Sequence, residues 1–412
     1  MERATTIESC RACGSPALLP IMSLGELPLA NSLVSPRCVA DRDPRFPLDL
    51  VLCPACALVQ ITETVPRERL FREYLYFSSY SSTMVAHADA LAARLVAERR
   101  LGGRSFVVEL ASNDGYLLQH FVRAGIDVLG VDPALNVAEE ARRRDIPTLT
   151  EFFDVGVAER IAARRGRADV VLGLNVLAHV ADLPGFVAGV ERLLHRDGVA
   201  VFEVPDVCAL VARRAFDTIY HEHLAYFSVT SLRNLLGRHG LALVQVEHLP
   251  IHGGSLRAFA AKAGVRAEHG SVGAALDEEA RWGVASPDAY RPLGEGVASV
   301  RSELNELIDG VRAQGASVAA YGAAAKGTML LNCCGLGTDR VGFVVDRNLA
   351  KQGHLVPGTR QPVRPVSALA DQRPDYLLLL VWNLVGEVVD QQAGYRREGG
   401  RFIVPVPEPT LL

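Results

Sequence analysis

The sequence lacks the long apolar run that a membrane-spanning helix requires. Its longest apolar stretch, around residues 377–385, is too short to cross a bilayer and is flanked like a buried strand. The N-terminus has no basic segment followed by an apolar one, so we expect no secretory signal. These absences predict a cytoplasmic protein that has no membrane as a partner.

A large excess of charge of one sign is also missing. The 43 basic and 47 acidic residues leave a formal net charge of −4. Nucleic acids and anionic membranes bind basic surfaces, so we expect no nucleic-acid partner, and any anionic ligand should be small. Aromatic residues reach only 6%, whereas 49% of the residues are hydrophobic and 22% are charged, which is typical of a globular protein.

The eight cysteines are not spread as in a disulfide scaffold, because five of them precede residue 57. Four form the pairs Cys10-x-x-Cys13 and Cys53-x-x-Cys56, and paired thiolates of this spacing bind Zn²⁺ as a closed tetrahedral site. We therefore predict a structural zinc ion, with four unligated thiols as the alternative. The gap of about forty residues between the pairs exceeds that of a compact zinc ribbon, so the proline-rich loop must fold back.

At 412 residues the chain is longer than one ordinary domain. Residues 1–66 are rich in cysteine, proline and turn residues, which predicts a small zinc-binding domain stabilised by metal instead of a large core. In residues 67–268, strand-like and helix-length segments alternate, which indicates a doubly wound parallel sheet. The strand-like segments are 106–110, 127–131, 170–174 and 198–204, followed by a closing hairpin of 242–249 and 255–261.

Residues 269–412 begin with a helical pattern and continue as a second α/β unit. Its strand-like segments are 317–321, 341–345, 375–381 and 401–406. The predicted fold class is thus α/β, with a small zinc-binding module, a central Rossmann-like domain and a second Rossmann-like domain at the C-terminus.

The strand expected at 106–110 ends in an acidic residue and a turn of small residues, Glu109-Leu110-Ala111-Ser112-Asn113-Asp114-Gly115. Small residues let the backbone approach the methionine part of S-adenosylmethionine (SAM). Asp132 follows the next strand, where its carboxylate can accept the ribose hydroxyls. The spacing predicts SAM binding, with an ordinary turn and strand-end carboxylate as the alternative; the missing G-x-G-x-x-G pattern disfavours a dinucleotide. The expected cofactor contacts are Glu109, Ala111, Ser112, Asn113, Gly115, Asp132 and Asn175.

Residues 216–228 hold a dense group of titratable side chains. They follow the strand-like segment 198–204, so they belong at the carboxyl edge of the sheet, where open α/β folds bind ligands. His221 and His223 are two positions apart and would point in different directions on a helix, which disfavours a shared metal ion. The segment therefore predicts a catalytic site, with a purely structural cluster as the alternative.

These residues, with the two cysteine pairs and the second α/β unit, resemble the family of SAM-dependent nucleotide-sugar C-methyltransferases of deoxysugar and antibiotic biosynthesis. The likeness covers essentially the whole chain. Further motifs that carry it are Leu24-Gly25-x-x-Pro28-Leu29-Ala30-Asn31, Tyr76-x-x-Ser79, Tyr220-His221-Glu222-His223, His252-Gly253-Gly254 and Tyr321-Gly322-Ala323-x-Ala325-Lys326-Gly327. One departure is Ala111, where the family usually has glycine, and we expect it to narrow the approach to the cofactor slightly.

The resemblance implies a class I SAM methyltransferase domain and a C-terminal domain that helps to hold a nucleotide sugar. The implied reaction moves a methyl group from SAM to a ring carbon, C3 first and C5 as the alternative, beside the ketone of a dTDP-4-keto-deoxysugar. The carbon loses its proton to form an enolate, so a base and an oxyanion stabiliser are needed. By motif match His223 is the base, and Tyr220 and Glu222 orient it or the sugar. His179 and Tyr76 are supporting groups.

The substrate contacts implied by the same match are Ser79, His221, His252, Tyr321 and Lys326. Lys326 lies near a predicted helix N-terminus, where its ammonium group and the helix dipole would both attract a diphosphate; the alternative is that residues 318–326 are ordinary sheet architecture. His179 has a plain alternative as a strand-end residue bonded to the backbone, and His252 as a turn residue before two glycines.

Two rival functions are open at this point. A nicotinamide-dependent oxidoreductase would use Gly322 and Asp346 of the C-terminal unit, but Gly327 comes late for a dinucleotide turn. A non-enzymatic adaptor built on the zinc module is disfavoured because the sequence has no basic patch. The sequence leaves the oligomeric state open.

Overall fold

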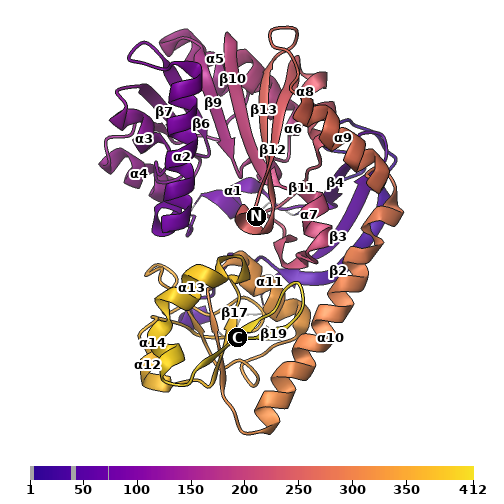
Figure 1. The fold of residues 1–412 in the computed structure, drawn as a ribbon, viewed down its shortest axis with the longest axis vertical. Coiled ribbons are helices and arrows are strands. Elements are labelled where there is room, and N and C mark those ends of the chain that lie inside the picture. The colour runs from indigo at the N-terminus through magenta and orange to yellow at the C-terminus, as the bar shows by residue number, and fades with distance from the viewer. Residues whose placement is uncertain (1–3, 39–42, 73) are drawn as a thin grey trace.

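The computed structural model describes residues 4–38, 43–72 and 74–412, which form sheets of two, four, six and seven strands. Figure 1 shows the central α/β unit above the C-terminal one, with strands β2 (Leu19–Pro28), β3 (Arg45–Cys53) and β4 (Leu58–Ile61) beside their junction. The long helix α10 (Arg291–Ala313) runs along the same side and connects the two units. The junction is therefore a place where all three parts of the chain meet.

The N-terminal sheet has the order β11-β4-β3-β2, and β11 (Ala225–Tyr226) comes from the middle of the chain. A separate pair consists of β1 (Thr5–Thr6) and β5 (Glu63–Thr64). Strands β3 and β4 are antiparallel partners with Cys53 opposite Leu58. The second cysteine pair therefore lies in the turn of a hairpin.

The central sheet has the order β12-β13-β10-β9-β6-β7-β8, in which β6 to β10 are parallel and β12 and β13 form an antiparallel hairpin. Parallel sheets are covered on both faces, and the neighbouring side chains of Val107 and Val108 are accordingly both buried. The strands are β6 (Phe106–Leu110), β7 (Asp127–Val131), β8 (Thr148–Leu149), β9 (Ala168–Leu174), β10 (Leu194–Pro205), β12 (Leu241–Leu249) and β13 (Ser255–Lys262).

Helices cover both faces of this sheet. On one face lie α2 (Ser82–Arg99), α3 (Leu118–Arg123) and α4 (Leu135–Arg143). On the other lie α5 (Val155–Arg165), α6 (Leu183–Leu193), α8 (Val229–Arg238) and α9 (Gly270–Trp282). The shorter helices α1 (Arg67–Phe71) and α7 (Val207–Ala212) belong to the connections.

The C-terminal sheet has the order β16-β15-β14-β17-β18-β19, and its pairs are parallel except for β18 with β19. Its strands are β14 (Val318–Tyr321), β15 (Val344–Val345), β16 (Val363–Arg364), β17 (Tyr376–Leu379), β18 (Arg401–Val404) and β19 (Thr410–Leu411). Its helices are α11 (Ala325–Cys334), α12 (Ala368–Gln372), α13 (Val385–Gln391) and α14 (Ala393–Arg397).

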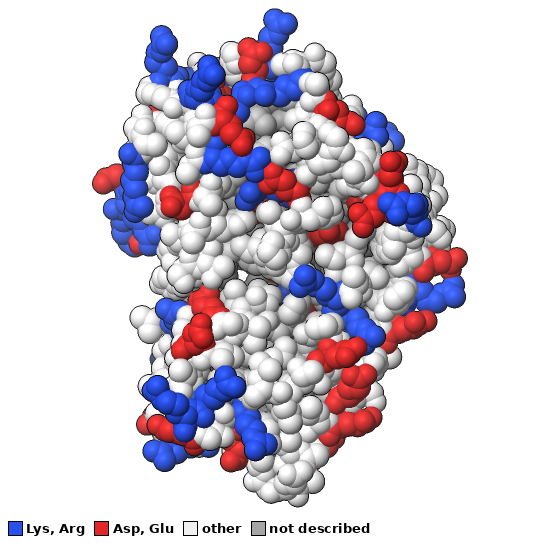
Figure 2. Space-filling model, viewed as in Figure 1, with Lys and Arg blue, Asp and Glu red and all other residues white. Residues whose placement is uncertain are grey.

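The parallel part of each large sheet reverses its strand order once, between β6 and β9 and between β14 and β17. Open α/β sheets bind ligands outside the carboxyl ends of the strands at such a point. The predicted fold class, a zinc-binding module with two Rossmann-like units, is confirmed. Among the helices of the described residues, none is long and apolar enough to cross a membrane, and Figure 2 shows acidic and basic side chains interspersed on the viewed face.

Candidate active site

The four cysteine sulfurs of the N-terminal module lie together. The Sγ atoms of Cys10 and Cys56 are 3.5 Å apart. Those of Cys13 and Cys53 are 3.6 Å apart, and all four lie within 4.8 Å of one another. A tetrahedral zinc ion with Zn–S distances of about 2.3 Å places its sulfur ligands about 3.8 Å apart, so these residues fit the ion. Four thiolates complete its coordination, which makes such a site structural.

The turn after β6 has an unusual backbone. Ala111 (φ 55°), Asn113 (φ 51°) and Gly115 (φ 78°) all lie in the left-handed region. A residue with a Cβ pays about 1–2 kcal/mol there, whereas glycine adopts this region freely. The alanine at position 111, where the family usually has glycine, therefore strains the backbone of this turn.

Two carboxyl groups of the turn are buried with an oxygen that has no hydrogen-bond partner among the described residues. These oxygens are Glu109 Oε2 and Asp114 Oδ1. Buried polar groups are nearly always paired, so the two atoms suit a polar ligand. Burial also raises the pKa of Glu109 well above its usual range. The Ser112 hydroxyl is a third buried atom without a hydrogen-bond partner among the described residues. It faces Gly130, where an added Cβ would lie 2.4 Å from it.

Asp132 follows β7 and faces the same turn. Its Oδ2 accepts the Asn113 N–H at 2.8 Å, and its Oδ1 accepts the Ala134 N–H at 2.9 Å. Burial raises the pKa of Asp132 to about 6. Each oxygen keeps one lone pair for a further donor. Asn175 (φ 55°) follows β9, on the other side of the point where the strand order reverses. Its N–H donates to the Glu203 carbonyl at 2.8 Å.

A loop from before α2 is fastened onto this turn. Asn113 Nδ2 donates to the Tyr76 carbonyl at 2.9 Å, and the Ser78 N–H donates to Asn113 Oδ1 at 2.9 Å. Ser79 Oγ donates to Asp114 Oδ2 at 2.5 Å. Ser79 thus holds the loop, while the Tyr76 side chain is 40% exposed.

Tyr220 and His223 form a hydrogen-bonded pair in the segment after the 3₁₀ turn Phe216–Thr218. Tyr220 Oη lies 2.8 Å from His223 Nε2, and His223 Nδ1 lies 2.9 Å from the Thr218 carbonyl oxygen. A carbonyl only accepts, so Nδ1 carries the proton, and Nε2 accepts from the Tyr220 hydroxyl. Burial holds the pKa of His223 well below its usual value. The imidazole is therefore neutral, and its Nε2 lone pair faces the Tyr220 hydroxyl.

His179 and Glu222 lie beside this pair. The ring centres of His179 and His223 are 4.8 Å apart, and burial lowers the pKa of His179 to about 4. Glu222 is 3% exposed, and burial raises its pKa to about 7. The cluster thus combines two neutral imidazoles with a carboxyl group, and the pKa of that carboxyl group lies in the range that favours acid–base chemistry at neutral pH.

The C-terminal unit adds a buried amine to the cluster. Lys326, at the start of α11, has an Nζ atom without a hydrogen-bond partner among the described residues, 4.3 Å from the Trp382 ring centre. Trp382 follows β17, and its Nε1 donates to Asp217 Oδ2 at 2.6 Å. Asp217 directly precedes the Thr218 carbonyl that binds His223. The carboxyl edge of the second sheet therefore reaches the segment that carries His223.

His252 belongs to the same group. It has a left-handed backbone (φ 56°) in the 3₁₀ turn Ile251–Gly253. Gly253 packs so closely on Trp382 that an added Cβ would lie 2.9 Å from the ring. Burial lowers the pKa of His252 to about 4, and the charge of Lys326 adds to this.

Two predicted residues lie apart from this group. His221 donates from Nε2 to the carbonyl oxygens of Phe46 and Pro47 at 3.2 and 3.1 Å, so it ties the segment to β3. Tyr321 is 5% exposed, and its hydroxyl donates to Gln391 at 3.3 Å within the C-terminal unit. Both residues stay among the proposed substrate contacts, and His221 has a buried Nδ1 atom without a hydrogen-bond partner among the described residues.

Three residues without an expected role lie at the site. Asn31 donates to Glu222, Trp382 contacts Lys326, and the buried Lys351 approaches the cluster from the C-terminal unit. Trp382 is one of two tryptophans and follows the strand expected at 375–381, so the sequence could have marked it as a candidate site residue. Nothing in the sequence marks Lys351.

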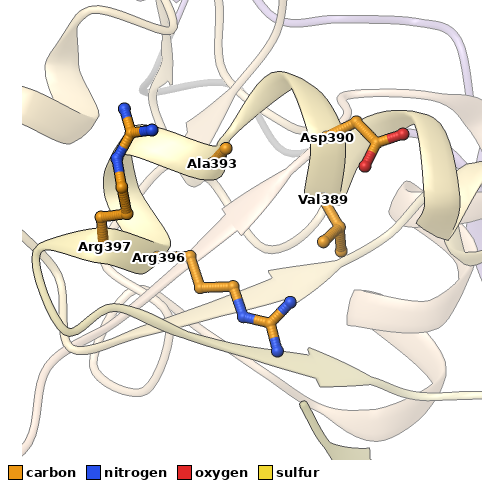
Figure 3. A pocket seen from close by; sticks show the side chains of 5 residues that line it. All are labelled: Val389, Asp390, Ala393, Arg396 and Arg397. Carbon is orange, nitrogen blue, oxygen red and sulfur yellow. The ribbon is translucent and has the colours of Figure 1, made fainter.

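A surface depression between α13 and α14 is a separate feature. It is lined by Val389, Asp390, Ala393, Arg396 and Arg397. Figure 3 shows the two guanidinium groups pointing in different directions. The arginines do not converge on one ligand, and none of the five residues belongs to the cluster described above.

Three family models match successive parts of the chain: a zinc binding domain at residues 10–71, a methyltransferase domain at 83–246, and a C-methyltransferase C-terminal domain at 250–407. The C-methyltransferase NovU of Streptomyces niveus is 39% identical over 407 residues, which cover 98% of this chain and 97% of NovU. The chain belongs to the SAM-dependent C-methyltransferase family.

More distant relatives match this C-methyltransferase over shorter stretches. A ubiquinone biosynthesis O-methyltransferase of Azorhizobium caulinodans is 30% identical over 96 residues, which are 23% of this chain and 38% of the relative. The crystal structure of magnesium protoporphyrin IX methyltransferase from Synechocystis PCC 6803 with bound SAM covers 43% of this chain and 79% of its own, with 18% identity and a TM-score of 0.33.

Proposed function

We propose that this C-methyltransferase acts on a dTDP-4-keto-deoxysugar and methylates the ring carbon beside the ketone, C3 first, with C5 of a related sugar nucleotide as the alternative. The observation that carries the proposal is the Tyr220–His223 hydrogen bond, located where the carboxyl edges of the two sheets approach each other. Carbon gives up a proton far less readily than oxygen or nitrogen, so a built acid–base pair suits methylation of carbon.

His223 is the base of this reaction. The Tyr220 hydroxyl bonds to Nε2 and orients the ring, and Nε2 accepts the proton of the substrate carbon when that bond opens. The Nδ1 bond to the Thr218 carbonyl holds the ring in the required orientation. The positive charge gained by the imidazole is balanced by the negative charge of the enolate.

Residues around the Tyr220–His223 pair bind the substrate. Lys326 attracts the diphosphate through its ammonium group and the N-terminus of α11, and His252 lies beside it. Glu222 and His179 orient the sugar and the base, Tyr76 is a supporting group, and Ser79 contacts the substrate. Residues 1–66 act as the zinc-binding domain, 67–268 as the methyltransferase domain, and 269–412 as the domain that holds the nucleotide sugar.

The residues of the turn after β6 would hold the cofactor. Glu109, Ala111, Ser112, Asn113 and Gly115 would contact its methionine part, Asp132 would accept hydrogen bonds from its ribose hydroxyls, and Asn175 would border it from the end of β9. When bound, SAM supplies the methyl group to the enolate carbon. No redox cofactor and no catalytic metal take part.

Mass spectrometry tests the substrate class. The enzyme is incubated with SAM and a panel of dTDP-4-keto-deoxysugars, and we expect one of them to gain the mass of one methyl group. Fragmentation then locates the methyl at C3 or C5. A panel in which no member gains mass would refute the proposed substrate class.

The base is tested by His223→Ala and Tyr220→Phe. Loss of a general base lowers kcat by about 10²- to 10⁴-fold, while KM changes little because the base acts chiefly in the transition state. Tyr226→Phe is the matched control, since it removes from the same segment a hydroxyl that lies 3.4 Å from the Thr218 carbonyl oxygen and, within the described residues, makes no hydrogen bond to the His223 ring. If His223→Ala methylates within a few-fold of the wild-type rate, the base is another residue.

A further inference from the structure

The N-terminal module touches the catalytic cluster through a residue that is not a metal ligand. Asn31 follows β2 at the end of the motif that begins at Leu24. Its Nδ2 donates to Glu222 Oε2 at 2.7 Å. Glu222 is buried, so the N-terminal module sets the orientation of a buried carboxyl group of the cluster.

The residues on both sides of His223 are bound to the same module. His221 donates to two carbonyl oxygens of β3, and the Ile61 N–H donates to the Leu224 carbonyl at 3.1 Å. Strand β11 then continues the pairing along β4. Residues 221–226 are therefore bound to the N-terminal sheet, while the His223 ring faces Tyr220.

The strands that hold this segment also carry the metal ligands. Strand β3 ends in Cys53, and β4 begins two residues after Cys56. Arg11, beside Cys10, donates to the Ile61 carbonyl at 3.0 Å, so the first cysteine pair is tied to β4 as well. A zinc ion shared by the two pairs would therefore hold the β3–β4 hairpin on which the catalytic segment lies.

We propose that the N-terminal module is a positioning device for residues 220–226, in which Asn31 orients Glu222 and bound zinc keeps the β3–β4 hairpin in place. The identity of the catalytic cluster in this inference rests on the proposed function. Such a device matters because β11 is two residues long and depends on β4 for its position. A displacement of about 1 Å in a catalytic group can cost about 10²-fold in rate.

Asn31→Ala tests the positioning role in the zinc-loaded enzyme. We expect kcat to fall by about 10- to 100-fold, with the Kd for SAM and the KM for the sugar nucleotide within about twofold of wild type. The matched control is Asn234→Ala: Asn234 also links the central unit to the module, through a 3.2 Å bond to the Cys56 carbonyl, but does not contact Glu222. A kcat for Asn31→Ala equal to that of the control would overturn the role of Asn31.

Amide hydrogen exchange tests the role of the metal without requiring turnover. The full chain is measured with zinc and after zinc removal by a chelator. We expect lost protection in residues 45–61 and 220–226, while β6 and β7 stay protected and SAM affinity is retained. Protection that is unchanged at 220–226, or lost equally throughout the central sheet, would overturn the inference. Since this readout needs no sugar nucleotide, it separates failure of this inference from failure of the proposed function.

Discussion

Asp132 provides a direct test of the cofactor assignment. Its carboxylate is 5% exposed and accepts two backbone N–H groups, yet burial outweighs these bonds and raises its pKa to about 6. Donation from the ribose hydroxyls favours the ionised carboxylate. SAM should therefore bind more tightly above about pH 6 and lose affinity as the pH falls below this value and the carboxyl group becomes protonated.

The size of the effect follows from the bond that is lost. A hydrogen bond to a charged group contributes about 1.5–3 kcal/mol, which corresponds to about 10- to 150-fold in Kd. We expect Asp132→Asn to weaken SAM binding by this factor near pH 8 and by less near pH 5, because the wild-type carboxyl group is then largely protonated itself. The variant should lose the part of the pH dependence that arises from Asp132.

Isothermal titration calorimetry with SAM between about pH 5 and pH 8 measures both effects. Asp127→Asn is the matched control, because Asp127 begins the same strand at its opposite end and pairs there with Arg165 on the surface. This control should keep the wild-type Kd and pH profile. If Asp132→Asn binds SAM with unchanged affinity, or keeps the wild-type slope with pH, the assignment of Asp132 to the ribose is wrong.

Other parts of the molecule give shorter tests. Metal analysis should find about one zinc per chain, and Cys13→Ser should lose it; well under one zinc in the wild type would contradict the site. Ala111→Gly relieves left-handed strain at the cost of glycine's backbone entropy, so denaturant unfolding should show a net gain of up to about 1 kcal/mol, and a clear loss of stability would speak against that account. Lys326→Met should raise the KM for the sugar nucleotide more than that for SAM, and equal changes in both would argue against a diphosphate contact.

The sequence alone predicted those features of the molecule that depend on residues close together in the chain. The strands expected at 106–110 and 127–131 are β6 and β7 with the same bounds, because a fully buried parallel strand is a continuous apolar run. The cysteine pairs converge as their spacing predicts. By contrast, the strand expected at 341–345 shrinks to Val344–Val345, since an apolar run does not specify how many of its residues find a partner strand.

The site itself depends on contacts between distant parts of the chain. Sequence reasoning selected Tyr220 and His223, and their hydrogen bond joins residues three positions apart. It also grouped His221 with them, although pairing with the N-terminal module turns His221 toward β3. The contacts of Asn31 and Trp382 with this segment bridge the zinc module and the second sheet to the central unit. Spacing along the sequence thus determines which segments carry chemistry, whereas the packing of three units determines which side chains meet, because that packing depends on surfaces that no local pattern describes.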